Sequence, residues 1–197
     1  MLKTKKLTAV ILILSILFLC AAMLSCNNNQ NKGRIPVSPD GGAYQVMLKP
    51  EWTAIKISEN IDTLAIQHKE LSLMVIIECY TKANLADVNI TDIDGFMKFY
   101  KLFNNTKETY ENENNNVEEL RELTAKEMKK TQLTAGKRQI VLIAPSENTA
   151  NVNLTTEYIY LEMAKHYFLV SYSVQNENHT DDVINAVNDV IYNIQTD

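Results

Sequence analysis

The sequence has little of the residues that most metal, redox and nucleotide-binding sites require. Its 197 residues include three Cys, three His and five Gly. No two His stand at a spacing typical of a zinc site, and there is no G-x-S-x-G elbow, P-loop or G-x-G-x-x-G stretch. Asp87, Asp92 and Asp94 lack the Gly and the distant Glu of a calcium loop, so we assign them to helix capping. We predict no metal site, no cofactor and no catalytic residue.

Cysteine is too scarce for a disulfide framework. Cys20 and Cys26 lie in or directly after the first apolar segment, which leaves Cys79 as the one further thiol. A lone Cys cannot form an internal disulfide, so the fold must depend on its hydrophobic core. Cys79 has no basic neighbour in the sequence, which is typical of a structural thiol rather than a nucleophile.

In place of a catalytic motif the sequence has an export signal. Three lysines among the first six residues precede an uncharged, mostly apolar segment over 7–25, which ends in Ser25. A basic start, an apolar run and a small final residue are typical of a secretory signal. Cys26 follows directly, as in bacterial lipoproteins, where the thiol receives a diacylglycerol and the chain carries palmitate-type acyl groups. We predict a signal peptide over 1–25 and lipidation at Cys26.

Two other interpretations of this segment stay open. Its 19 uncharged residues are close to the roughly 20 that an uncleaved membrane anchor needs, and an ordinary secretory signal followed by a coincidental Cys is the other. In all three cases the positive-inside rule keeps the lysines in the cytoplasm and exports everything after Cys26. Asn27, rather than an acidic residue, follows Cys26, so we expect the outer membrane in a host with two membranes and the cell membrane otherwise.

Positive charge is scarce in the exported part. Removing the signal leaves 16 basic against 24 acidic residues, a net charge of −8. Nucleic acids and anionic lipid surfaces both attract clustered Lys and Arg. We therefore predict no nucleic-acid partner, and contact with the membrane through the lipid anchor.

The exported part divides into a tether and one domain. Residues 26–42 hold the lipidated Cys and a polar stretch rich in Asn, Gly and Pro, which is typical of a disordered linker. Residues 43–197 show no internal repeat and are long enough for one domain with a sizeable core.

Hydrophobic periodicity predicts a mixture of strands and helices in this domain. The stretch 71–80 is the most apolar and indicates a central strand buried on both faces. Thr91, with Asp94 three residues later, resembles a capping box at the start of a helix, and Thr180 precedes a second helix. The expected strands are 43–48, 52–58, 63–68, 71–80, 137–144, 155–163 and 167–174, and the expected helices are 91–110 and 180–194.

The strands 155–163 and 167–174 are expected to form a hairpin. In the expected register all partners on one face are apolar, because Met163 pairs with Phe168, Leu161 with Val170 and Ile159 with Tyr172. A shift of one residue would mix the two faces. Lys165–His166 is a poor two-residue turn, so we expect a four-residue loop.

Aromatic residues supply the candidate binding surface. Tyr158 and Tyr160 lie on the second face of the hairpin, and Trp52 begins an earlier strand. Aromatic residues on strands are more often packing residues, so the alternative is that all three belong to the core.

The order of these elements, with Pro50, Trp52, Gly136 and the final hairpin TEYIYLEMAKHYFLVSYSV, resembles the PsbP-like family over residues 43–197. The resemblance implies an α/β (α+β) fold, in which helices flank a central, mainly antiparallel sheet as an α/β/α sandwich. Members of that family are binding proteins, assembly factors and chaperone-like modules, so the resemblance implies a fold and a binding role without a catalytic site.

The function expected from the sequence is that of a lipid-anchored, non-enzymatic protein of the bacterial cell envelope that binds another envelope protein, as an assembly or stability factor. Two alternatives stay open. One is an envelope hydrolase whose site is dispersed over the sheet, and the other is a lipoprotein that binds a small ligand between sheet and helix.

Overall fold

The structure is a computed structural model that describes residues 33–55, 62–103, 115–129, 131–143 and 153–196. A compact unit extends over Ile35–Asp197, and the description below concerns that unit. The predicted signal peptide and lipidation site, Cys26, lie outside the described residues. No described helix combines the length and the apolar character needed to cross a bilayer.

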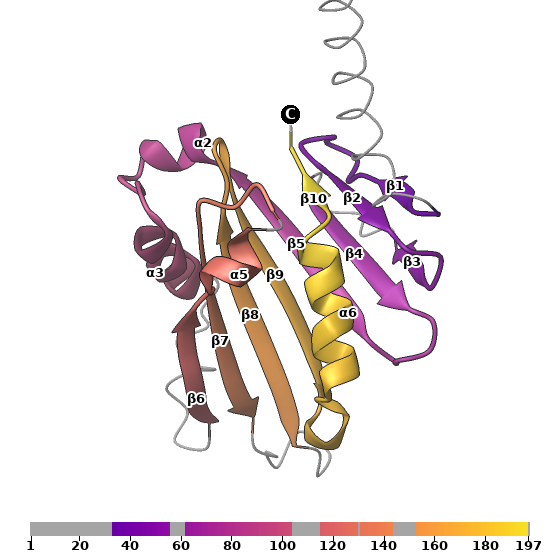
Figure 1. The fold of residues 1–197 in the computed structure, drawn as a ribbon. Coiled ribbons are helices and arrows are strands. Elements are labelled where there is room, and N and C mark those ends of the chain that lie inside the picture. The colour runs from indigo at the N-terminus through magenta and orange to yellow at the C-terminus, as the bar shows by residue number, and fades with distance from the viewer. Residues whose placement is uncertain (1–32, 56–61, 104–114, 130, 144–152, 197) are drawn as a thin grey trace, which may run out of the picture. The chain divides into compact units, whose positions relative to one another are not determined.

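A seven-stranded sheet forms the centre of the unit (Figure 1). Each neighbouring pair of strands is antiparallel, which confirms the predicted fold class. In spatial order the strands are β3 (Trp52–Ile55), β4 (Thr63–His68), β5 (Met74–Thr81), β9 (His166–Gln175), β8 (Leu154–Glu162), β7 (Ala135–Ile143) and β6 (Asn115–Glu122).

A second sheet joins the two ends of the unit. β2 (Gln45–Leu48) lies between β1 (Ile35–Val37) and β10 (Ile194–Gln195), antiparallel to both. Residues 35–37 fall within the segment predicted as a tether. Because Ile35 pairs with Leu48 and Val37 with Val46, the folded unit begins at Ile35 rather than at residue 43, and the tether prediction is corrected there.

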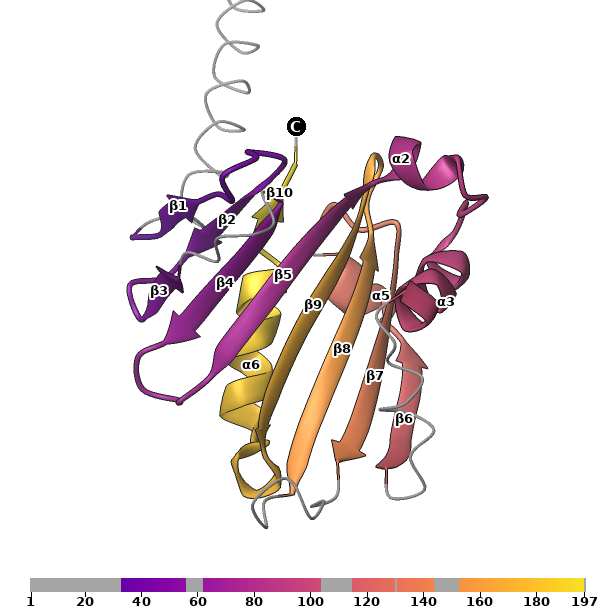
Figure 2. The ribbon, with the colours of Figure 1, turned by 180° about the vertical axis from the view of Figure 1, so that it is seen from behind.

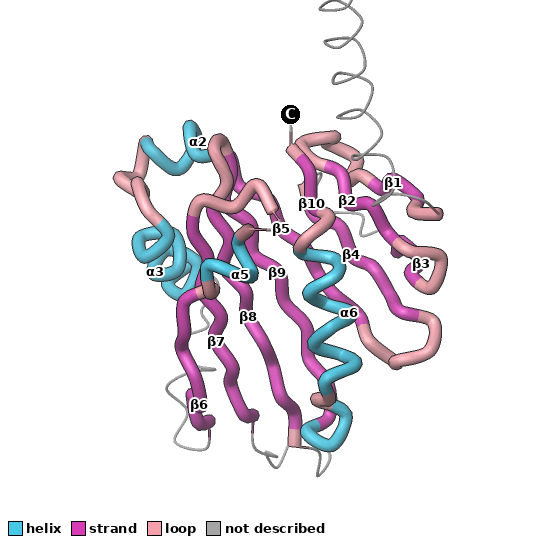
Figure 3. Tube along the Cα trace, in the orientation of Figure 1, coloured by secondary structure: helices cyan, strands magenta, loops and turns pink. Residues whose placement is uncertain are grey.

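Helices lie against both faces of the large sheet, as the helices in cyan show in Figure 3 and the reverse view in Figure 2. One face carries α6 (Asp181–Ile191) and the short α5 (Ala125–Met128), and the other carries α3 (Ile93–Phe103). The remaining helical elements are α2 (Lys82–Ala86) and the 3-10 turn η1 (Asn176–Asn178).

Each face has its own hydrophobic core, because side chains on a strand alternate between the two faces. On the α6 side, the apolar stripe of that helix packs on alternate residues of β8 and β9; its core includes Ile159, Leu161, Phe168, Val170, Val183, Val187, Val190 and Ile191. On the α3 side, Phe96 stacks on Tyr167 with ring centroids 4.9 Å apart. Tyr160 meets the edge of the same Phe96 ring.

The β8–β9 hairpin has the predicted faces but a different register. Leu161 pairs with Phe168 and Ile159 with Val170, which is a shift of two residues from the predicted pairing. The Met163 N–H donates to the His166 carbonyl at 2.8 Å, so the loop is the two residues Ala164–Lys165 and not a four-residue loop. A shift of two keeps every side chain on its own face, which is why the apolar pattern alone does not separate the two registers.

Two further predictions are corrected. The strand β5 is central, but it is not buried on both faces: Met74 is 48% exposed, and Ile76 and Glu78 are only partly buried. At the start of α3, the Asp92 carboxylate accepts a hydrogen bond from the Gly95 N–H at 2.7 Å, so Asp92 is the capping residue and not Thr91. A complete capping box occurs instead at α5, between Thr124 and Glu127.

Candidate functional site

The three aromatic residues of the predicted binding surface do not share one exposed face. Trp52 is 6% exposed and packs edge-on against His68 in the core on the α6 side. Tyr160 is fully buried beneath α3, and Tyr158 is half-buried beside it. Burial gives Trp52 and Tyr160 a packing role, and a binding role for Tyr158 stays a prediction.

The α3 face of the sheet is only partly covered by described elements. α3 packs against β7 and β8, and its Phe96 and Tyr100 contact Tyr80 and Glu78 in the second half of β5. No described helix or strand lies over β3, β4 and the first residues of β5 on this side (Figure 2). Strand register places residues of adjacent strands side by side here. We name this surface the β3–β5 face; it consists of Thr53, Ile55, Ala65, Gln67, Met74, Ile76, Ser171 and Ser173, of which Ala65 is fully buried.

Three apolar side chains of the β3–β5 face are exposed or partly exposed. Met74 is 48% exposed and Ile55 is 36% exposed, and Ile76 is partly buried. Ile76 follows Met74 on β5, and Ala65 of β4 pairs with both Ile76 and Ile55. Exposed, uncharged polar residues surround them, namely Thr53, Gln67 and Ser173. None of these residues carries a charge, and Glu78, two residues after Ile76 on β5, is the charged side chain at the border of the face.

A half-buried carboxylate borders this face where it meets α3. Glu78 accepts a hydrogen bond from the Tyr80 hydroxyl at 2.6 Å and from the Tyr100 hydroxyl at 3.3 Å. Burial, together with the nearby Glu78 charge, raises the pKa of both tyrosines well above the usual value, so both stay protonated donors. With two protein donors on its oxygens, Glu78 has the surroundings of a structural carboxylate rather than of a general acid or base.

On the opposite face, a buried ion pair connects β7 and β8 to the helices. Arg138 and Glu157 are 4% and 2% exposed, and the guanidinium donates to the carboxylate at 2.8 Å. Arg138 also donates to the Asn188 side-chain oxygen on α6. The Tyr172 hydroxyl donates to Glu157 at 2.5 Å, so one charged pair connects two strands of the sheet to α6.

A pocket opens between α5 and α6 beside this ion pair. We name it the α5–α6 pocket; its volume is about 410 Å³, and it is lined by Lys126, Glu127, Asn185, Asn188, Asp189 and Tyr192. Both guanidinium nitrogens of Arg121 donate to the Glu127 carboxylate at 3.1 Å. Burial raises the pKa of Glu127, but hydrogen bonds from Arg121 and Thr124 outweigh it and lower the pKa to about 2. Glu127 is therefore an anion at any physiological pH.

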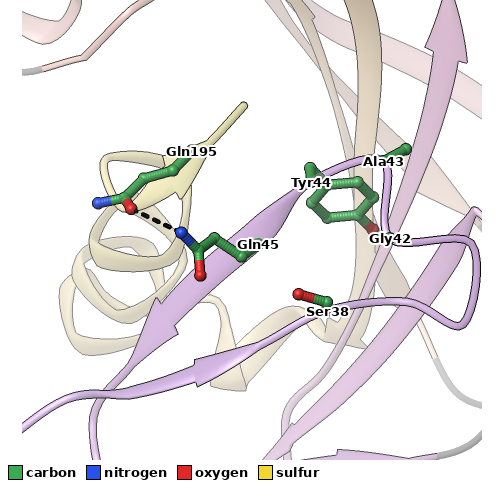
Figure 4. A pocket seen from close by; sticks show the side chains of 6 residues that line it. All are labelled: Ser38, Gly42, Ala43, Tyr44, Gln45 and Gln195. Atoms are coloured by element: carbon green, nitrogen blue, oxygen red, sulfur yellow. Dashed lines mark hydrogen bonds between the residues drawn. The ribbon is translucent and has the colours of Figure 1, made fainter. Parts of the chain in front are cut away.

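A smaller pocket lies beside β2 and β10 (Figure 4). It has a volume of about 220 Å³ and is lined by Ser38, Gly42, Ala43, Tyr44, Gln45 and Gln195. Gln45 Nε2 donates to Gln195 Oε1 at 3.2 Å across one wall, and the Tyr44 hydroxyl donates to the Ile77 carbonyl at 2.9 Å. Its volume falls below the roughly 300–1,000 Å³ of most small-ligand sites, and three of its polar side chains already have protein partners.

Metal-binding and nucleophilic chemistry gain no support from the geometry. Among the described residues, no three His, Cys, Asp or Glu side chains come together as a metal site. Cys79 is half-buried, and burial, with the nearby Asp62 charge, raises the pKa of its thiol to about 12. Such a thiol is protonated at neutral pH and is a poor nucleophile.

Sequence reasoning missed the residues that form these sites. Met74 and Ile76 lie in the apolar stretch that was assigned to the interior. Arg138 and Glu157 are far apart in the chain and meet only through the β7–β8 pairing. The sequence did contain one signal. Glu157 lies an even number of positions before Ile159 and Leu161, so a charged side chain lies on the core-facing side of the strand.

Comparisons with known proteins give structural similarity only. No family model and no curated protein matches the chain. Cyanobacterial PsbP from Synechocystis is similar at 8% identity and a TM-score of 0.47, over 84% of this chain and 94% of that one. LpqN of Mycobacterium tuberculosis, described as involved in cell envelope biogenesis, is similar at 11% identity and a TM-score of 0.45, over 83% and 91%.

A crystal structure from Bacteroides thetaiotaomicron is similar at 9% identity and a TM-score of 0.43, over 84% of this chain. The chain spans about half of that protein, 48% of its length. Similarity at this level concerns the fold, and no functional argument follows from it.

Proposed function

We propose that this chain is a lipid-anchored, non-enzymatic module of the bacterial cell envelope that binds another envelope protein through its β3–β5 face. The observation that carries the proposal is the exposure of Met74 and Ile55 on a sheet face that no described element covers. The export signal and Cys26 supply the location, as expected from the sequence.

The composition of the β3–β5 face matches a protein interface. Interface cores are depleted of charge and enriched in Met and aromatic residues, with a polar rim. Here Met74 and Ile76 are the apolar residues of β5, and the polar Gln67 and Ser171 lie beside them on β4 and β9. These residues carry no charge, so docking on them does not remove a charge from water, which is the costly step in burying a polar surface. The bordering Glu78 keeps its two tyrosine donors. The partner is accordingly a protein with an uncharged, partly apolar surface.

The simpler alternative is that this face is the solvated side of an antiparallel sheet. A solvated side has polar residues at its outward positions. Ser171, Ser173 and Gln67 follow that pattern, but Met74, Ile76 and Ile55 do not. The departing residues lie on β5 and β3, on either side of Ala65 of β4, and such an apolar patch is what docking requires.

Site-specific photocrosslinking in living cells tests the proposal. A photoreactive amino acid replaces Met74 in one variant and Val88 in another. Val88 is a matched control because it is an exposed apolar residue, 56% exposed, outside the β3–β5 face. We expect a discrete adduct from position 74 that mass spectrometry identifies as one envelope protein, and no such adduct from position 88.

A substitution then tests whether the contact matters. Met74→Glu places a charge at the centre of the face and should remove the partner in native copurification, while Val88→Glu should leave it unchanged. Equal adducts from both positions would contradict the proposal. So would the absence of any reproducible partner combined with turnover of an envelope substrate that a single Asp, Glu or His substitution abolishes, which is the result expected of a hydrolase.

A further inference from the structure

The α5–α6 pocket lies on the opposite side of the large sheet from the β3–β5 face and takes no part in the proposed function. One wall is a polar stripe on α6. Asn185, Asn188, Asp189 and Tyr192 recur at intervals of three or four residues, which places them along one line of the helix. This stripe is separate from the apolar stripe that packs on the sheet. Of these four residues only Tyr192 also packs against the core.

The polar groups around the pocket are held in place before any ligand arrives. Glu127 is fixed by the Arg121 guanidinium and by the capping box with Thr124. Asn188 is fixed from behind, because Arg138 donates to its side-chain oxygen. Because the Asn188 side-chain oxygen already accepts this hydrogen bond, its amide nitrogen is the group that can donate a hydrogen bond to a ligand. Groups held in this way lose little conformational freedom when a ligand binds.

Both carboxylates at the pocket are already matched by protein partners. Glu127 is paired with Arg121 at 3.1 Å, and Asp189 with Lys49 at 3.4 Å, while Lys126 contributes an exposed positive charge. A cationic ligand would have to displace one of these pairs and approach Lys126, and an anionic one would enter beside two carboxylates. The amides and carboxylates instead provide hydrogen-bond donors and acceptors side by side, which suits a ligand whose hydroxyl groups both donate and accept.

Tyr192 adds an aromatic ring to an otherwise polar lining. A tyrosine ring packs against apolar C–H surface and still presents a polar end. A pocket volume of about 410 Å³ lies within the roughly 300–1,000 Å³ range of small-ligand sites. From these features we propose that the α5–α6 pocket binds a neutral sugar unit, either as a free saccharide or as part of a cell-wall polymer.

Saturation-transfer NMR on the full-length protein, in a detergent without a sugar headgroup, tests this proposal. The probes are glucose, N-acetylglucosamine and the cationic glucosamine, at millimolar concentration. Co-sedimentation with insoluble cell-wall material forms the second arm and detects the polymer. The test variant is Asn185→Ala, at an exposed position of α6. The control is Asn178→Ala, an equally exposed Asn of η1 outside the pocket.

We expect saturation transfer to a neutral sugar, less to glucosamine, and about a tenfold loss of affinity in Asn185→Ala, which corresponds to roughly 1.4 kcal/mol. Asn178→Ala should bind like the wild type. Co-sedimentation that Asn185→Ala removes, without a monosaccharide signal, supports the polymer as the source. No binding in either arm, or binding that Asn185→Ala leaves unchanged, overturns the proposal without affecting the β3–β5 face.

Discussion

Arg138 and Glu157 are two charged side chains in a place where folded proteins seldom leave charge. Their ion pair lies within the core-facing layer between the sheet and α6. The mutual attraction of such a pair roughly offsets the cost of removing both charges from water. The pair therefore contributes more to the choice of one arrangement of β7, β8 and α6 than to the total stability.

The first prediction separates these two contributions. Arg138→Met leaves the Glu157 carboxylate buried without its cation, so it should lower the free energy of unfolding by about 3–5 kcal/mol. The double variant Arg138→Met/Glu157→Leu removes both charges and should recover most of that loss. Urea unfolding followed by circular dichroism measures both. A double variant as unstable as the single one would show that the ion pair itself stabilises the fold.

The second prediction concerns pH and Glu127. Its pKa in the folded protein is about 2, below the ordinary value of 4.5. Between these values the unfolded state binds more protons than the folded state, so stability rises with pH. The stabilisation that Glu127 provides is present above about pH 4.5 and is lost as the pH falls toward 2.

Unfolding curves at several pH values test this expectation. Glu127→Gln should be less stable than the wild type at neutral pH, and the difference should shrink steadily as the pH falls from 4.5 toward 2. Glu122→Gln is the control, because the Glu122 side chain is 82% exposed. A difference between wild type and Glu127→Gln that does not change with pH would contradict the assignment.

Among the secondary-structure elements, the helix α3 is stabilised by hydrogen bonds in its first turn. The Asp92 carboxylate accepts the Gly95 N–H, and the Asp92 carbonyl accepts the Phe96 N–H. The third prediction is that Asp92→Ala lowers stability by about 1 kcal/mol, the usual cost of a lost N-cap, whereas Thr91→Ala changes it little. Thermal unfolding of the two variants measures the difference. Equal losses would restore Thr91 as the capping residue.

The sequence predicted long elements well and short ones poorly, for a physical reason. The strands β4, β5, β7, β8 and β9 and the helix faces of α3 and α6 have enough apolar side chains to show a period. The eight-residue β6, NNVEELRE, is mostly polar and was not predicted despite its length. β1 and β10 have three and two residues and are too short to show one. The short helix α5 carried its own signal, the Thr124–Glu127 capping box, which sequence reasoning did not use. The hairpin faces were correct, but its register required the loop length, which the pattern does not contain.

The sequence predicted the candidate sites less well than the secondary-structure elements. The α5–α6 pocket and the ion pair bring together residues from β7, β8, α5 and α6, and their proximity exists only after the strands pair. The β3–β5 face was hidden for a different reason. An apolar stretch such as 71–80 predicts burial on average, and it cannot show which of its outward positions the rest of the chain leaves uncovered.

For the whole molecule, the export signal gives the fourth prediction. Intact-mass analysis of protein purified from membranes should show a chain that begins at Cys26 and carries added acyl mass. Cys26→Ser should remove the acyl mass and retain residues 1–25, since the thiol is the acceptor in lipoprotein processing. A wild-type chain that retains residues 1–25 would favour an uncleaved anchor, and one cut without acylation would favour an ordinary secretory signal.

The three-stranded sheet has a consequence for how the chain matures. Gln45 on β2 pairs with Gln195 on β10, a partner 150 residues later in the chain. A polypeptide that emerges from its N-terminal end can form β1–β2 early, but β2 keeps an open edge until the last residues arrive. In such a chain every strand of the large sheet, the last of which ends at Gln175, has emerged before β10 is available to cover this edge. A chaperone that binds strand edges would recognise this open edge and release the domain when β10 closes the sheet.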